Sequence, residues 1–213
     1  QQMFPQGYTL GSCLTVNLTP KELDRLIALV TPLYLDFSPE STPEKIRGRL
    51  TRDPSTAIDL LYKGESLVCF GVYYARKVEE KKICFRDGIV LKEGERNQGF
   101  YKEFVQLGLD RYPSDLLMTR TREPRVYKTL RRFAESGGLY PREGSTPPLF
   151  VAEIAQLFCG AKEASDFDPV TLVVKNIHTD EKPFLKVDDP GIMEFFARYL
   201  GPRDAFMVVV PTR

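Results

Sequence analysis

The sequence has little of what would indicate several common classes of protein. Its 30 Lys and Arg residues nearly balance its 29 Asp and Glu residues, which argues against a dedicated nucleic-acid binder. No apolar run reaches the roughly 18 residues that span a bilayer, so we expect no association with membranes. The N-terminal stretch has neither a basic region nor a long apolar region, so it does not resemble a secretory signal.

Metal-binding residues are also scarce. One histidine, His178, and four cysteines without a CxxC pair argue against a zinc site, so we expect no metal. Cys69 and Cys84 lie inside apolar, strand-like runs. We therefore expect free thiols in a reducing compartment and a cytoplasmic protein.

What the sequence does contain is a regular succession of helix and strand patterns. Thr19 and Pro20, with Glu22 three residues after Thr19, predict a capped helix that Pro32 ends or kinks. Apolar spacing and turn residues predict the remaining elements. The expected helices are 20–30, 43–50, 99–111, 125–135, 149–159 and 190–200, and the expected strands are 12–18, 56–62, 66–76, 83–91, 115–121, 170–177 and 205–210.

Short turns join the strands between residues 56 and 91, which predicts an antiparallel meander. The following strand–helix–strand unit predicts a right-handed crossover and a parallel strand pair. The expected fold class is therefore α/β, a mixed sheet with helices on both faces. We expect one domain over residues 1–213, with a core at 12–143 and an extended C-terminal segment at 144–213, partly an insertion.

The stretch from Ile83 to Arg111 organises the chain, because it leads from a strand through a polar turn into an amphipathic helix. The turn reads Glu93-Gly94-Glu95-Arg96-Asn97-Gln98-Gly99. Free backbone N–H groups at a helix start, together with the helix dipole, favour anions. The alternative is an ordinary polar turn with a glycine at a helix start.

With the meander and this turn in place, the chain resembles the GNAT family of N-acetyltransferases over about residues 12–139. That family carries a Q/R-x-x-G-x-G/A motif between its fourth strand and the next helix, and its backbone N–H groups bind the pyrophosphate of acetyl-coenzyme A. Tyr101 stands where the family has Gly or Ala. The matching residues here are Arg96, Asn97, Gln98, Gly99, Phe100 and Tyr101.

The resemblance also implies catalytic groups. A family tyrosine that protonates the departing thiolate falls at Leu130 in this sequence, and Tyr127 lies three residues earlier on the same side of the helix. Tyr127 is therefore a substitute acid, or alternatively a residue that packs between helix and sheet. A backbone N–H near Ile89–Leu91 would hold the thioester carbonyl oxygen.

Asp87 is the one acidic residue inside the third strand of the meander. If it shares a face with Ile89 and Leu91, it lies among apolar neighbours, where a carboxyl group holds its proton more tightly. Such a group suits a general base that takes the proton of the amine. The alternatives are that Asp87 pairs with Arg86 or a neighbouring strand, or lies beside Gly88 at a β-bulge.

The resemblance implies an acyl-coenzyme A-dependent N-acyltransferase that uses acetyl-coenzyme A or another acyl-coenzyme A and an amine on a small molecule or peptide. A coenzyme A- or ligand-binding protein without transfer activity and an interaction module, such as a homodimer, remain alternatives. Residues 31–42 are either an acceptor lid or a packed connector. Five arginines lie at the end of the fifth strand or follow it, and they either meet the coenzyme A phosphates or an acidic substrate, or form a solvated surface: Arg120, Arg122, Arg125, Arg131 and Arg132.

Overall fold

The computed structural model describes residues 4–134, 138–161, 163–178, 181 and 183–212. The chain divides into two compact units. The first comprises Gln1–Arg76 and Cys84–Pro113, and the second comprises Lys77–Ile83 and Ser114–Arg213. No helix in the described part of the chain is long and apolar enough to cross a membrane.

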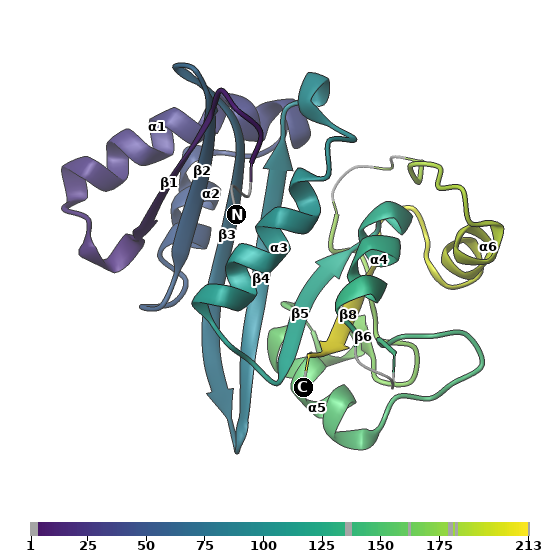
Figure 1. Cartoon of the computed structure of the whole chain (residues 1–213). Coiled ribbons are helices and arrows are strands. Elements are labelled where there is room, and N and C mark those ends of the chain that lie inside the picture. Colours follow the sequence, from purple (N-terminus) through teal and green to yellow (C-terminus); the bar gives the residue numbers. More distant parts are fainter. Residues whose placement is uncertain (1–3, 135–137, 162, 179–180, 182, 213) are drawn as a thin grey trace. The chain divides into compact units, whose positions relative to one another are not determined.

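Four strands run through the first unit in the order β1-β2-β3-β4 (Figure 1). β1 with β2 and β2 with β3 pair antiparallel. β4 is the hydrogen-bonded neighbour of β3 and runs in the opposite direction (Figure 1), which confirms the meander. Short turns rich in glycine and charged residues allow the chain to reverse between these apolar strands. The strands are β1 (Tyr8–Leu14), β2 (Ala57–Lys63), β3 (Ser66–Val78) and β4 (Lys81–Leu91).

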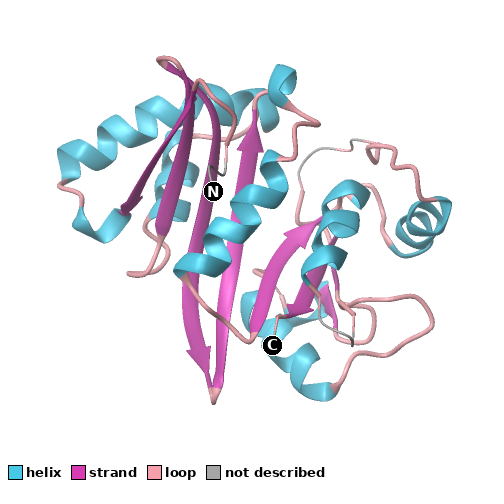
Figure 2. Cartoon of the chain, viewed as in Figure 1, coloured by secondary structure: helices cyan, strands magenta, loops and turns pink. Residues whose placement is uncertain are grey.

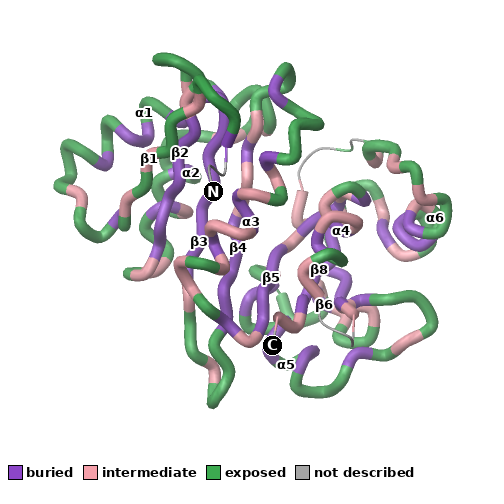
Figure 3. The backbone as a smooth tube through the Cα atoms, viewed as in Figure 1, coloured by how far each residue is buried: buried purple, intermediate pink, exposed green. Residues whose placement is uncertain are grey.

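Helices cover both faces of these strands, because alternate side chains of a strand point to opposite sides. Ile58 and Leu60 pack with α1 (Pro20–Phe37) and α2 (Pro43–Leu50), whereas Leu61 packs with α3 (Phe100–Arg111). In Figure 1, α3 lies in front of the strands and α1 and α2 lie behind them. The buried residues accordingly run along the central strands in Figure 3. The expectation of helices on both faces is confirmed for this unit.

A glycine lets α3 approach the strands closely. A Cβ atom on Gly108 would lie 2.7 Å from the ring of Tyr73, so only glycine fits against that ring. The Tyr73 hydroxyl donates a hydrogen bond of 2.7 Å to the carbonyl oxygen of Phe104. These two contacts fix α3, and with it the turn that precedes the helix.

Helix α1 is longer than the sequence predicts, since it continues through Pro32 to Phe37. The burial of Leu33 and Tyr34 outweighs the hydrogen bond that proline removes, and the Tyr34 ring stacks 5.9 Å from the ring of Phe70. The prediction that the helix ends near residue 30 is therefore wrong. Much of the predicted lid is helical, and the connector to α2 is short.

From Ser114 onward, the described residues of the second unit form four strands in the order β5-β8-β7-β6, all paired antiparallel. They also form three α-helices, and Figure 2 colours strands magenta and helices cyan. The core of this unit is aromatic: Phe195 stacks 4.9 Å from Phe206, and Phe196 meets Tyr127 at 5.5 Å. The elements are β5 (Leu116–Thr121), α4 (Pro124–Leu130), α5 (Leu149–Phe158), β6 (Phe167–Asp168), β7 (Val173–Val174), α6 (Pro190–Tyr199) and β8 (Ala205–Pro211). Residues 135–137, part of the predicted end of α4, lie outside the described residues.

The predicted strand at 170–177 is mostly wrong, because only Val173–Val174 is a strand. The carboxylate of Asp168 accepts hydrogen bonds from the Val170 N–H at 2.9 Å and from the Thr171 hydroxyl. This side chain makes the chain turn before the strand begins. The α/β class is confirmed. Cys69, Cys84 and Cys159 are buried and Cys13 is half-buried. The single-domain prediction stays a prediction.

Candidate active site

The turn after β4 has the backbone conformation of an anion-binding loop. A 3₁₀ turn at Glu93–Glu95 leads to Asn97 and Gly99, whose φ angles of 68° and 82° lie in the left-handed region. Asparagine and glycine adopt that region most readily. Gly99 occupies the N-cap position of α3 and supplies no capping side chain, so the first N–H groups of the helix are left for a ligand or water.

Glu95 holds this turn against the strands. Its carboxylate is largely buried and accepts hydrogen bonds from the Tyr8 hydroxyl, from Lys63 Nζ at 2.9 Å and from Gln98 Nε2 at 2.9 Å. The hydrogen bond from Tyr8 and then that from Lys63 lower the pKa of Glu95. Sequence reasoning missed this role, because an acid in a polar turn looks solvated until β1 is placed beside it.

The predicted cofactor-binding residues divide into exposed and inward-facing groups. Arg96 and Gln98 are exposed, and Arg96 lies 3.8 Å from the surface carboxylate of Glu93. Phe100 is buried against Phe4 and Tyr8. The half-buried Ile89 and Leu91 pack on the α3 side of the strands.

Tyr101 also turns inward. Its ring lies under the guanidinium group of Arg86, 4.9 Å away, so it packs along β4. Its hydroxyl oxygen is buried and has no hydrogen-bond partner in the described part of the chain. Burial raises the pKa of Tyr101 to about 12. The side chain that departs from the family motif is therefore folded against the strand.

The face of β4 changes at Asp87. Cys84 and Arg86 contact α3. Regular alternation would place Ile89 on the other side of the strand, yet Ile89 also packs on the α3 side. Between them Asp87 faces α2, and a Cβ atom on Gly88 would also lie 3.8 Å from Arg49 Nη1. Two consecutive residues on one side are typical of a β-bulge. The expectation that Asp87 shares a face with Ile89 and Leu91 is wrong, while the bulge alternative agrees with these contacts.

Asp87 lies among arginines, so the predicted apolar neighbourhood is also wrong. Its carboxylate forms ion pairs of 3.0 Å with Arg52 and 3.8 Å with Arg49, and its side chain is 0% exposed. Arg49 Nη1 also donates to the Asp87 carbonyl oxygen at 3.2 Å. The arginines could not be assigned from the sequence, because 38 positions separate Arg49 from Asp87 and only the fold brings them together.

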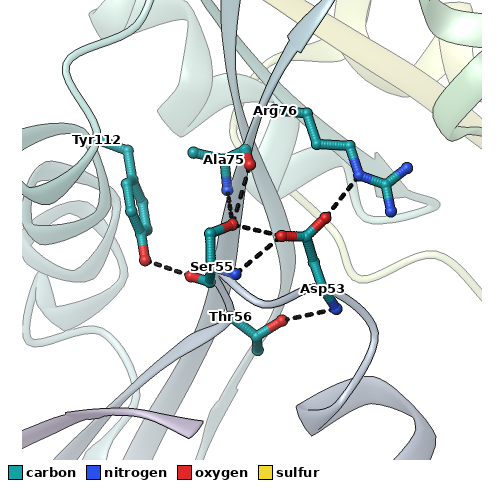
Figure 4. A network of polar contacts seen from close by, with 6 residues as sticks. All are labelled: Asp53, Ser55, Thr56, Ala75, Arg76 and Tyr112. Carbon is teal, nitrogen blue, oxygen red and sulfur yellow. Dashed lines mark hydrogen bonds and ion pairs between the residues drawn. The ribbon is translucent and has the colours of Figure 1, made fainter. Parts of the chain in front are cut away.

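A polar network fixes the chain directly after Arg52 (Figure 4). The Asp53 carboxylate accepts hydrogen bonds from the Ser55 backbone N–H at 2.9 Å and from Arg76 Nε at 2.7 Å. Burial raises the pKa of Asp53, but the hydrogen bonds from Ser55 and Arg76 outweigh burial and lower it overall. The Ser55 hydroxyl donates to the Ala75 carbonyl oxygen, which ties the loop to β3.

The predicted catalytic tyrosine, Tyr127, forms a hydrogen bond within the second unit. The Tyr127 hydroxyl donates a hydrogen bond of 2.6 Å to the Pro141 carbonyl oxygen, and burial raises its pKa to about 12. Leu130, at the position of the family tyrosine, is fully buried. These contacts agree with the packing alternative for Tyr127.

Three arginines at the end of β5 and after it donate hydrogen bonds to main-chain carbonyl groups. Arg120 donates to Cys159 at 3.0 Å and Arg122 donates to Pro202 at 3.2 Å. Arg125 donates to Lys186 at 2.7 Å. These contacts give the three side chains structural roles within the second unit.

Comparisons with known proteins find matches among solved structures alone. No family model matches the sequence, and no curated protein does. Solved structures match at low identity, and the first of these described here is Naa50 of Arabidopsis thaliana in complex with a bisubstrate analogue, at 11% identity and a TM-score of 0.47 over 95% of this chain and 97% of that one.

Two further matches are of the same kind. The NatC complex bound to Gag peptide and coenzyme A has 14% identity and a TM-score of 0.45 over 97% of this chain and 99% of that one. A GNAT-family acetyltransferase of Streptococcus pneumoniae has 13% identity and a TM-score of 0.44 over 65% and 89% of the two chains. Identities and TM-scores this low do not decide what this chain does, so its activity rests on its own residues.

Proposed function

We propose that this protein is an acyl-coenzyme A-dependent N-acyltransferase that moves an acetyl group from acetyl-coenzyme A to an amine. The observation that carries the proposal is the turn before α3, where Asn97 and Gly99 are left-handed and the helix start has no capping side chain. Such a turn presents several N–H groups to one anion, and the helix dipole adds partial positive charge.

The pyrophosphate of coenzyme A is the anion that we assign to this turn. Backbone N–H groups near Gln98–Tyr101 would bind its oxygens, and the Arg96 guanidinium group would add a charge-assisted hydrogen bond. The ion pair between Arg96 and Glu93 is long and exposed, so little free energy is lost when Arg96 turns to a phosphate. The side chains of Phe100 and Tyr101 pack inward, so they stabilise the turn on the side that faces away from the proposed ligand.

The thioester carbonyl group would lie at the end of β4. A β-bulge disturbs the regular pairing of a strand and leaves backbone groups for other partners. The change of face at Asp87 and Gly88 precedes Ile89–Leu91, where we propose that a backbone N–H binds the carbonyl oxygen as charge develops on it. This placement follows the strand that leads directly into the phosphate turn.

Transfer then proceeds by direct attack. The amine nitrogen forms a bond to the carbonyl carbon, the C–S bond breaks, the nitrogen loses a proton to water and the thiolate takes a proton from water. The environments of Asp87 and Tyr127 favour positioning and packing roles over the predicted base and acid, since one carries two ion pairs and the other donates to Pro141.

A second candidate is a protein that binds coenzyme A without transferring the acyl group. Leu130 favours it, because a buried leucine stands where the resemblance implies the acid. Two measurements separate the candidates. Acetyl-coenzyme A should raise the melting temperature under both, whereas release of free thiol in the presence of a panel of amines is expected for the enzyme alone. No thermal shift would contradict both candidates.

A further inference from the structure

Arg49 is held in place from three directions. Its guanidinium carbon lies 5.3 Å from the centre of the Tyr34 ring, and Nη1 contacts both the carbonyl oxygen and the carboxylate of Asp87. Both contacts with Asp87 use the same nitrogen of the guanidinium fork. A guanidinium group fixed in this way loses little rotamer entropy when it binds a second planar anion.

Arg52 is fixed as well, from the other side of the same carboxylate. It lies 3.0 Å from Asp87, and the next residue, Asp53, is tied to β3 through Ser55. Burial and the Asp87 charge raise the pKa of Tyr74, while the charge of Arg52 and a hydrogen bond with the Arg52 side chain act in the opposite direction, which places Tyr74 beside Arg52.

This cluster carries more positive than negative charge, and its arginines are more exposed than its aspartate. The Asp87 side chain is 0% exposed, whereas the side chains of Arg49 and Arg52 are 36% and 35% exposed. Two positive charges therefore share one buried negative charge, and part of each arginine reaches the surface. The next acid, Asp53, is paired with Arg76 at 2.7 Å and does not neutralise the excess.

We propose that Arg49 and Arg52 bind a carboxylate of the acceptor, so that the acyl group goes to an amine that carries a carboxylate only a few atoms from its nitrogen. The proposal rests on the proposed function, because it places the acceptor at the bulge of Asp87 and Gly88, immediately before the backbone assigned to the thioester. Asp87 acts as a positioning residue that holds the two guanidinium groups.

The carboxylate could belong to a free amino acid or to an acidic side chain at the start of a peptide. Two matched pairs of acceptors distinguish these sources: alanine against alaninamide, and glutamyl-alaninamide against glutaminyl-alaninamide. In one of the pairs, kcat/KM measured by thiol release from acetyl-coenzyme A should be about ten- to a hundred-fold higher for the acceptor that carries the carboxylate. A difference of this size is the usual effect of losing a hydrogen-bonded charge. Equal rates within both pairs would overturn the proposal.

Variants of the arginines test the assignment to residues. Arg49→Gln should raise KM for the carboxylate acceptor at least ten-fold more than it raises KM for the neutral partner. Arg49→Lys retains the charge beside Asp87 and removes the planar fork, so it should lose much of the preference without leaving Asp87 unpaired. Arg47→Gln is the matched control, because Arg47 lies on the same helix and pairs with Asp24.

Binding of acetyl-coenzyme A separates this proposal from the proposed function. Unchanged acetyl-coenzyme A affinity in Arg49→Lys, together with a lost carboxylate preference, is the expected result. If the wild-type protein binds acetyl-coenzyme A and acylates neutral amines as well as carboxylate-bearing amines, the acceptor proposal is wrong and the proposed function stands. If acetyl-coenzyme A does not bind, both fail.

Discussion

At the scale of single residues, two tyrosines whose hydroxyl groups are buried on the α3 side of the strands show how a hydrogen-bond partner decides whether a hydroxyl group stabilises the fold. Tyr73 donates to the Phe104 carbonyl oxygen, whereas the Tyr101 hydroxyl is buried without a partner in the described residues. A buried hydroxyl that has lost its hydrogen bonds to water destabilises the folded state unless the protein replaces them.

We therefore expect opposite effects from the same substitution. Tyr101→Phe should raise the free energy of unfolding by about 1 kcal/mol, because it removes an unpaired polar group, and Tyr73→Phe should lower it by about 1 kcal/mol. Urea denaturation of both variants measures the difference. A loss of stability in Tyr101→Phe equal to that in Tyr73→Phe would show that the Tyr101 hydroxyl has a partner.

Glu95 makes the turn sensitive to acid. Its pKa in the folded protein lies below the ordinary value of 4.5 because of its hydrogen bonds, first of all that from Tyr8. A depressed pKa means that Glu95 contributes stability above pH 4.5, and that this contribution is lost as the pH falls through the folded-state pKa. Glu95→Gln should therefore lower the unfolding midpoint in urea at pH 7 and lower it by less at pH 3.

The acid-dependent difference has a simple control. Glu93→Gln removes an exposed carboxylate from the same turn, and its midpoint should follow the wild type at both pH values. If Glu95→Gln and Glu93→Gln behave alike at pH 7, Glu95 does not hold the turn.

At the scale of elements, α1 shows a tertiary contact that overrides a local signal. Pro32 removes one helical hydrogen bond and its ring crowds the carbonyl group of Ala28, yet the helix continues because Leu33 and Tyr34 are buried beyond it. Pro32→Ala should raise the free energy of unfolding by about 1–3 kcal/mol.

Pro20→Ala is the matched control for that measurement. Pro20 is the first residue of the helix, where a missing N–H costs nothing, so its replacement should leave stability unchanged or slightly lower. A destabilised Pro32→Ala variant would contradict this account of α1.

The elements also show where sequence reasoning reaches its limit. Apolar alternation and capping residues predict most helices and strands, including the capping box of Thr19 and Glu22 that begins α1. Alternation alone places Asp87 on the same side as Ile89 and Leu91, because it does not reveal the bulge at Asp87 and Gly88 that shifts the alternation of the residues after it. It also overextends the strand around Val173, because the Asp168 side chain stabilises a turn that local apolar content does not reveal.

At the scale of the whole molecule, the sequence predicts the framework of the candidate site better than its chemistry. The turn and the helix start follow from local residues such as Gly99, so they could be placed without a structure. The arginines around Asp87 and the tyrosine and lysine around Glu95 come from distant elements, so only the fold identifies them. Chemistry that depends on long-range pairs therefore remained outside the prediction.

The most direct test of the central claim is the affinity for acetyl-coenzyme A of Gly99→Val, measured by isothermal titration calorimetry. A Val side chain strains the left-handed backbone at φ 82° and distorts the turn, so binding should weaken at least ten-fold. Gly144→Val is the control, because Gly144 has a φ of 69° and open space around it but lies in the second unit. Weak binding by Gly99→Val and wild-type binding by Gly144→Val is the expected result; wild-type affinity in Gly99→Val would contradict the assignment of the turn to the coenzyme A pyrophosphate.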